Sequence, residues 1–170
     1  MSEWKEPNVD MGKTITTYLM TGDPKRPQYV LISNKLCKMI ICPRSNLSII
    51  NEREELKTPS FYVLLGESED AKPKAYIGET EDFSARVKNH DYKKDFWNKA
   101  LIFVSIGGAM TKADVEYLEY KGIDVAMEEK RYILEKELWN FCCQFTSGCI
   151  SSRVLLPSCG RYSLHKKRNN

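Results

Sequence analysis

The chain has 170 residues, a formal net charge of +3 and a sequence pI of about 8.4. This length suffices for a buried core, and a charged fraction of 29% excludes a disordered polyelectrolyte. The longest apolar runs are too short to span a bilayer, and the first residues lack the basic and apolar regions of a secretory signal. We therefore expect a soluble cytoplasmic protein with no membrane partner, whose charge is compatible with a nucleic-acid partner but does not by itself indicate one.

The N-terminal part of the chain predicts a small β-unit. Residues 14–20, 28–32 and 36–41 are rich in β-branched and aromatic residues, and turn signals such as Gly22-Asp23-Pro24 separate them. We predict three short antiparallel strands followed by a charged linker with some helix. Residues 13–57 are therefore expected to form an N-terminal β-rich accessory unit and linker.

A different pattern begins after Pro59. Residues 60–65 form a nearly continuous apolar run, residues 75–78 form a second one, and the polar stretch between them predicts a hairpin with a long tip. Residues 99–106 predict a third strand. Together these segments favour a three-stranded antiparallel sheet.

One helix is predicted directly after the hairpin. Thr80 is a favourable N-cap, and Glu81 and Asp82 carry carboxylates that the helix dipole favours in the first turn. Residues 92–98 predict a short second helix or a turn before the third strand.

A further helix is predicted after the third strand. Thr111 and Asp114 have the spacing of a capping box, which predicts a helix start there. Behind it apolar or small residues recur every three or four positions, at Val115, Leu118, Gly122 and Val125. Glu119 falls on the margin of this stripe, so we expect its carboxylate to be partly desolvated. Residues 130–143 predict one more helix.

Residues 58–144 are thus predicted to form a mixed α and β domain, and residues 145–170 a weakly ordered basic tail. The six cysteines include no C-x-x-C pair, so neither a ribbon-type zinc site nor a thioredoxin-like motif is indicated. Four of them precede His165 late in the chain: Cys142, Cys143, Cys149 and Cys159. A loose metal site there is one interpretation, and reduced thiols of a cytosolic protein are the other.

Chemically capable side chains follow these elements in a definite order. Each strand of the hairpin carries a tyrosine, the next helix carries an arginine and a histidine one turn apart, and the later helix carries a glutamate. These candidate catalytic residues are Tyr62, Tyr76, Arg86, His90 and Glu119.

The order and spacing of these residues resemble the GIY-YIG nuclease family over roughly residues 59–127. The second family tripeptide is intact as Tyr76-Ile77-Gly78, whereas the first is reduced to Ser60-Phe61-Tyr62 and keeps only its tyrosine. Arg86 lies eight residues after Gly78, as the family arginine does. Asp95-Phe96-Trp97 is similar to a bacterial and phage subgroup that carries a β-rich N-terminal extension, although Lys136 stands where that subgroup often has asparagine.

The resemblance implies an α+β fold with a three-stranded antiparallel sheet flanked by helices, and a metal-dependent endonuclease that hydrolyses DNA phosphodiester bonds. Glu119 would hold a single Mg²⁺ or Mn²⁺ ion, and Arg86 would stabilise charge on the phosphate oxygens. The two tyrosines would orient or deprotonate the attacking water, with His90 as the other candidate base. Lys88, Lys93 and Lys94 would contact the DNA backbone, while Trp97 is expected to be packed rather than stacked on a base.

Each residue also has a structural interpretation. The tyrosines can be core aromatics of the strands, Arg86 and Glu119 solvated helix residues, and His90 an ordinary residue near a helix C-terminus. At the level of the whole protein, the loss of Gly and Ile from the first tripeptide motivates an alternative. In that alternative the chain is a non-catalytic DNA-binding or interaction module on a degenerate GIY-YIG scaffold.

Overall fold

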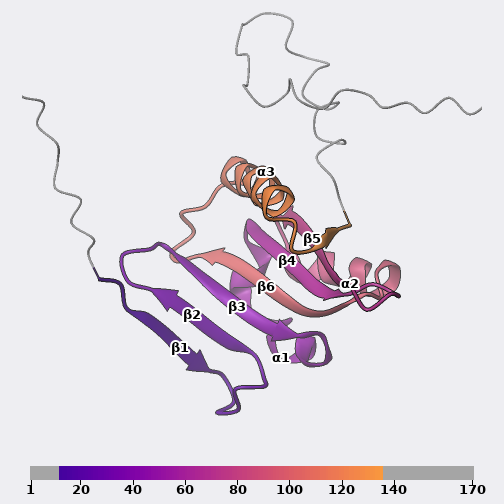
Figure 1. The fold of residues 1–170 in the computed structure, drawn as a ribbon. Helices are drawn as coiled ribbons and strands as arrows, with labels where there is room; N and C mark the ends of the chain where they lie inside the picture. Colours follow the sequence, from indigo (N-terminus) through magenta and orange to yellow (C-terminus); the bar gives the residue numbers. More distant parts are fainter. Residues whose placement is uncertain (1–11, 136–170) are drawn as a thin grey trace, which may run out of the picture. The chain divides into compact units, whose positions relative to one another are not determined.

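The computed structural model describes residues 12–135, apart from the side chains of residues 89–93. Seven strands form one sheet in the order β1-β2-β3-β6-β4-β5-β7 (Figure 1). The strands are β1 (Ile15–Leu19), β2 (Gln28–Ile32), β3 (Cys37–Pro43), β4 (Ser60–Glu67), β5 (Pro73–Thr80), β6 (Trp97–Ser105) and β7 (Ile133–Leu134). The helices are α1 (Leu47–Ile50), α2 (Phe83–Lys93) and α3 (Lys112–Glu129), with short 3-10 turns η1 (Arg44–Asn46) and η2 (Glu54–Lys57). No helix among these is both long and apolar enough to cross a bilayer.

The α+β class is confirmed, but the prediction of a three-stranded sheet is wrong. The three strands predicted after Pro59 are β4, β5 and β6, and they are neighbours in the sheet. β3 also pairs with β6, from Cys37 opposite Ser105 to Pro43 opposite Lys99. The β-rich segment at 13–57 therefore extends the same sheet, and the described chain belongs to one compact unit. The predicted tail at 145–170, the late cysteines and Lys136 lie outside the described residues.

The two faces of the sheet carry different helices. On β4, Tyr62 and Leu64 point to the face covered by α1, η2 and α2, where the larger core lies. Phe61 points to the opposite face, together with Ile77 of β5, and there Gly122 of α3 packs on both side chains. Figure 1 shows α3 on one side of the sheet and α2 on the other. The sheet thus separates the helix with the predicted arginine from the helix with the predicted glutamate.

α2 begins later than the sequence predicted. Its N-terminal cap is Asp82, whose Oδ1 accepts a hydrogen bond from the Ala85 N–H at 2.9 Å. The Thr80 hydroxyl instead accepts from the Asp82 N–H at 3.2 Å and supports the turn before the helix. The helix also runs on to Lys93, so the separate element predicted at 92–98 is absent from this part of the described chain. β6 then starts at Trp97, which is buried as predicted.

α3 has the predicted capping box, in which Thr111 accepts from the Asp114 N–H and the Asp114 carboxylate accepts from the Thr111 N–H. Its buried stripe differs from the prediction, because Val115, Glu119 and Ile123 are buried while Val125 is exposed. The spacing of apolar residues in the sequence did not predict this buried stripe, because its central residue, Glu119, is an acid.

The predicted helix at 130–143 is wrong at its start. Lys130 ends α3 in the left-handed conformation with φ 53°. Ile133 and Leu134 then form β7, which pairs with Lys74 and Ala75 at the β5 edge. Strand pairing overrides the helical spacing of these apolar residues, because the β5 edge offers unpaired backbone groups.

A charged cluster joins the first strands to η2. The Glu55 carboxylate accepts hydrogen bonds from the Tyr29 hydroxyl and from Arg53 Nε at 3.0 Å, and it lies 3.3 Å from Lys38 Nζ. Lys38 and Arg53 also lie 4.7 Å and 4.9 Å from the centroid of the Tyr29 ring. Burial raises the pKa of Glu55, but the Tyr29 and Arg53 hydrogen bonds and the Lys38 charge outweigh it and lower the pKa to about 2.

Glu55→Gln is expected to lower the free energy of unfolding at pH 7 by about 1 kcal/mol, because solvent screens part of this cluster. Since the pKa of Glu55 is lower in the folded chain than in the unfolded one, its contribution is complete above about pH 5 and fades as the pH falls toward 2. Urea unfolding at pH 7 and pH 4 measures this, with the exposed acid in Glu54→Gln as the control. An equal gap between wild type and Glu55→Gln at both pH values would contradict the prediction.

Candidate functional site

The β4–β5 hairpin brings the two predicted tyrosines together. Tyr62 lies opposite Gly78, and Tyr76 precedes Gly78 by two residues, so all three positions share one face of the sheet. The ring centroids of Tyr62 and Tyr76 are 6.0 Å apart with an interplanar angle of 35°. Both rings are buried on the side covered by α2.

Gly78 makes this arrangement possible. A Cβ atom at residue 78 would lie 2.7 Å from Cζ and Oη of Tyr62 and 2.8 Å from Cε1 of Tyr76, which is closer than van der Waals contact permits. The phenol end of Tyr62 therefore lies directly over the glycine. The Tyr-Ile-Gly sequence thus has a physical reason here: the tyrosine and the glycine shape one face of β5, while Ile77 packs under α3 on the other.

α2 adds Arg86 to the two tyrosines. Phe83 packs edge-on against Tyr62, with ring centroids 5.2 Å apart at 71°, and this contact fixes the first turn of the helix over the hairpin. Arg86 follows three residues later with an exposed side chain, and its guanidinium lies close enough to Tyr62, and then to Tyr76, for the two phenols to raise the pKa of Arg86. Three of the five predicted catalytic residues therefore lie in one cluster, which we call the Tyr–Arg cluster (Tyr62, Tyr76 and Arg86).

The environment of Tyr62 favours its protonated form. Burial raises the pKa of Tyr62 and the neighbouring Tyr76 raises it further, while the Arg86 guanidinium opposes them without reversing the direction. At neutral pH this phenol is a hydrogen-bond donor and not a base. A guanidinium and a phenolic O–H side by side present several donors and no negative charge, a combination that suits an anion such as a phosphate.

Glu119 comes from the other layer of the molecule. It is only 2% exposed and lies one turn from Val115 and one turn from Ile123 on the stripe with which α3 covers the sheet. It approaches the face opposite the Tyr–Arg cluster. In the described chain β7 pairs only with Lys74 and Ala75, so the β5 edge beyond Ala75 has no strand partner.

The remaining predicted site residues lie on α2 or directly after it. His90 and Lys93 belong to α2, but their side chains are outside the described residues. Lys88 is exposed on the same helix. Lys94 lies beside the cluster, with its Nζ 4.3 Å from the centroid of the Tyr76 ring and 3.3 Å from a carboxylate oxygen of Glu135.

Sequence reasoning missed two residues near Tyr76. Lys74 lies two positions before Tyr76 on the same face of β5, and its Nζ forms an ion pair with Glu135. No sequence signal pointed to this contact, because it depends on the β5–β7 pairing.

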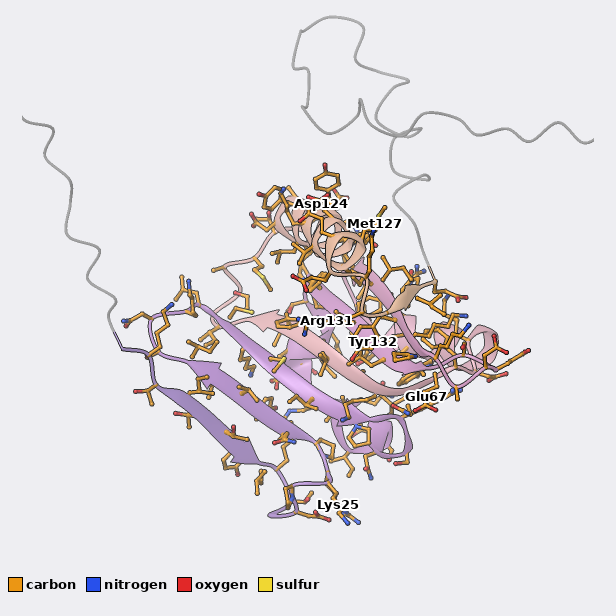
Figure 2. The ribbon with its side chains drawn as sticks, in the orientation of Figure 1. Lys25, Glu67, Asp124, Met127, Arg131 and Tyr132 are labelled. Carbon is orange, nitrogen blue, oxygen red and sulfur yellow. The ribbon has the colours of Figure 1, made fainter. Side chains whose placement is uncertain are left out.

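Two hollows lie elsewhere on the described chain. One, of about 270 Å³, is lined by Leu65, Gly66, Glu67, Pro73, Asn98, Lys99 and Tyr132, and Figure 2 labels Glu67 and Tyr132 at this place. The other, of about 330 Å³, lies by the β1–β2 turn and includes Lys25, also labelled in Figure 2, with Arg26 and Lys99. Neither is lined by a predicted site residue.

Among the side chains that the structure describes, which exclude those of residues 89–93, no group of three or more His, Cys, Asp or Glu residues could hold a metal ion. A carboxylate oxygen is nonetheless the hard ligand that Mg²⁺ and Mn²⁺ prefer, and Mg²⁺ commonly binds through one or two carboxylates while keeping several waters. Glu119 fits such an ion by donor chemistry, although its side chain is only 2% exposed.

The chain was compared with known protein families, with curated proteins and with solved structures, and no match was found in any of the three comparisons.

Proposed function

We propose that this protein is a metal-dependent endonuclease that hydrolyses DNA phosphodiester bonds with a single-metal site of the GIY-YIG type. The observation that carries the proposal is the Tyr–Arg cluster, in which the exposed Arg86 lies beside two tyrosines packed over a glycine that cannot be larger. The cluster has a fixed charge, several donors and an exposed guanidinium, which are the requirements for holding a phosphodiester.

The residues of the Tyr–Arg cluster and the nearby His90 have separate proposed roles. Arg86 contacts the non-bridging phosphate oxygens, where a planar fork of donors can stabilise charge that grows in the transition state. Tyr62 keeps its proton, since burial raises its pKa, and it orients Arg86 from the buried side of the cluster. His90, one turn after Arg86 on α2, is the candidate base, because an ordinary histidine titrates near neutral pH.

Glu119 is the proposed ligand of Mg²⁺ or Mn²⁺. Such an ion supplies Lewis-acid stabilisation of the phosphate and the leaving oxygen. The support from the chain is the type of donor and its position: a carboxylate in the middle of the buried stripe of α3, the helix that packs on β4 and β5.

Nicking of supercoiled plasmid tests the proposal. The full-length chain is expected to produce open-circular DNA with Mg²⁺ or Mn²⁺ and none with EDTA, and Glu119→Gln is expected to remove the metal-dependent activity. Glu128→Gln changes an exposed acid of the same helix and serves as the control, with circular dichroism to verify folding. Absence of nicking with every metal, or equal nicking by the wild type and Glu119→Gln, would refute the proposed metal-dependent endonuclease activity.

A second candidate function is a non-catalytic DNA-binding module. The burial of Glu119 on the α3 face favours it, as does Ser60, whose buried hydroxyl has no hydrogen-bond partner among the described residues where the family tripeptide has glycine. This candidate predicts that the chain binds labelled DNA in EDTA, that Arg86→Ala binds it more weakly, and that no metal produces cleavage.

We also infer a cytoplasmic location. Cys37 and Cys42 are free thiols, and burial raises the pKa of Cys42 to about 12, so this thiol is chemically inert. Free, unreactive cysteines on a central strand are in keeping with a reducing compartment.

A further inference from the structure

Two lysines lie beside Tyr76 on the face of the Tyr–Arg cluster. Lys74 precedes Tyr76 by two residues on β5, and its Nζ lies 4.8 Å from the centroid of the Phe96 ring. Lys94 follows α2 and lies over the Tyr76 ring. Their side chains are 24% and 17% exposed, so both ammonium groups are partly withdrawn from water next to each other. Two such cations repel, and the pair requires an anion between them.

The anion is Glu135, the residue that follows β7. Its N–H donates to the carbonyl oxygen of Ala75 at 2.9 Å, which continues the β5–β7 pairing by one residue. Its carboxylate forms ion pairs with Lys74 and, at 3.3 Å, with Lys94. The Lys74 hydrogen bond lowers the pKa of Glu135, burial opposes this, and the Lys94 charge adds to the lowering. A single carboxylate thus joins two lysines that come from different elements.

The same tyrosine connects this pair to the Tyr–Arg cluster. Lys94 lies 4.3 Å from the centroid of the Tyr76 ring, and the same phenol is close enough to Arg86 to raise its pKa. Arg86, Lys94 and Lys74 therefore form a row of three cations along one side chain and the strand beneath it. A row of this kind matches successive phosphates of a nucleic-acid strand better than it matches a single small anion.

We propose that Lys74 and Lys94 bind the DNA backbone phosphate next to the one held by Arg86, and that Glu135 occupies this subsite when DNA is absent. A carboxylate and a phosphodiester each carry one negative charge and present two oxygens, so one can take the place of the other between the lysines. This inference rests on the proposed function of the Tyr–Arg cluster and adds a regulated subsite to it. DNA must displace Glu135, and the β7 segment that carries it, from the edge of β5.

The balance of charge supports displacement. Two lysines and one carboxylate leave the subsite with a net positive charge while Glu135 is in place, so it still attracts a polyanion. The Glu135 side chain is 29% exposed, so it can leave into water. β7 is two residues long and its pairing with β5 is confined to Lys74 and Ala75, so few backbone hydrogen bonds oppose the release.

Fluorescence anisotropy of the full-length chain with a labelled DNA duplex in EDTA tests the proposal. Glu135→Gln is expected to tighten the Kd by about 3- to 10-fold, because the competing charge is removed while the size of the side chain is kept. Lys74→Ala and Lys94→Ala should each weaken binding and reduce the slope of log Kd against log salt by about 0.9. Lys72→Ala changes an exposed lysine two residues from Lys74 and is the matched control.

The outcomes separate this inference from the proposed function. If Arg86→Ala loses affinity for DNA but Glu135→Gln binds no more tightly than the wild type, the proposed subsite is refuted. The proposed role of the Tyr–Arg cluster in DNA binding is then unaffected. If the lysine variants keep both the affinity and the salt slope of the wild type, the subsite is refuted as well. If neither the wild type nor Glu135→Gln binds DNA, both proposals fail. Thermal unfolding of each variant shows whether a change in affinity reflects a change in folding.

Discussion

Replacing Arg86 with alanine is expected to lower the rate of plasmid nicking by about 10²- to 10³-fold, the usual effect of removing one donor that stabilises developing charge. Arg86 is exposed and lies beside the phenols of Tyr62 and Tyr76, so its guanidinium is the charged group of the Tyr–Arg cluster that a phosphate can reach. Single-turnover nicking with excess protein measures the chemical step.

Arg86→Lys is the informative control. Lysine keeps the charge but has no planar fork, so it cannot hold two phosphate oxygens and both phenols at once. We expect Arg86→Lys to restore DNA binding more fully than the nicking rate. If both proteins are folded and the nicking rate of Arg86→Ala is within about threefold of that of the wild type, Arg86 takes no part in the reaction.

The second large effect is expected at Gly78. Gly78→Ala should lower the free energy of unfolding by about 3 kcal/mol, at the upper end of the cost of overpacking a core. The new methyl group would lie 2.7 Å from the phenol end of Tyr62, and Tyr62 cannot retreat because Phe83 packs against its ring. Urea unfolding followed by tryptophan fluorescence measures the change, since Trp97 lies in the same core.

Gly122→Ala is the matched control for Gly78→Ala. Its Cβ would lie 3.0 Å from Cζ of Phe61, a side chain that is only half-buried and can shift. Alanine also improves helix propensity by about 1 kcal/mol over glycine, which offsets the crowding. We expect Gly122→Ala to change stability far less than Gly78→Ala does. Equal effects would show that the tyrosine rings do not require glycine at position 78.

Local patterns in the sequence were sufficient for much of the fold. Apolar runs and turn residues predicted the strands, because β-branched residues and Gly-Asp-Pro turns act over a few residues. The alternation of side chains along paired strands also explains why Tyr62, Tyr76 and Gly78 meet on one face, once the hairpin is recognised. The part of the site built from neighbouring elements was therefore predictable.

Contacts between distant segments were not predictable from local patterns. The pairing of β3 with β6 and of β7 with β5 joins strands that are far apart in the sequence. The type of residue in a strand does not indicate which other strand it will pair with. The burial of Glu119 was underestimated because hydropathy assigns acids to the surface, whereas three-dimensional packing places this one between Val115 and Ile123. The ion pair of Lys74 with Glu135 depends on the same long-range pairing.

The pairing of β3 with β6 has a practical consequence for handling the protein. The family resemblance alone would suggest expressing a fragment that begins at residue 58. Such a fragment lacks β3, so seven residues along the β6 edge would lose their strand partner. That edge carries Leu101, Ile102, Phe103 and Val104, and an unprotected apolar edge strand is a template for intermolecular aggregation. The N-terminal strands cover this edge of β6, and we expect the fragment without them to aggregate more readily than the full-length chain.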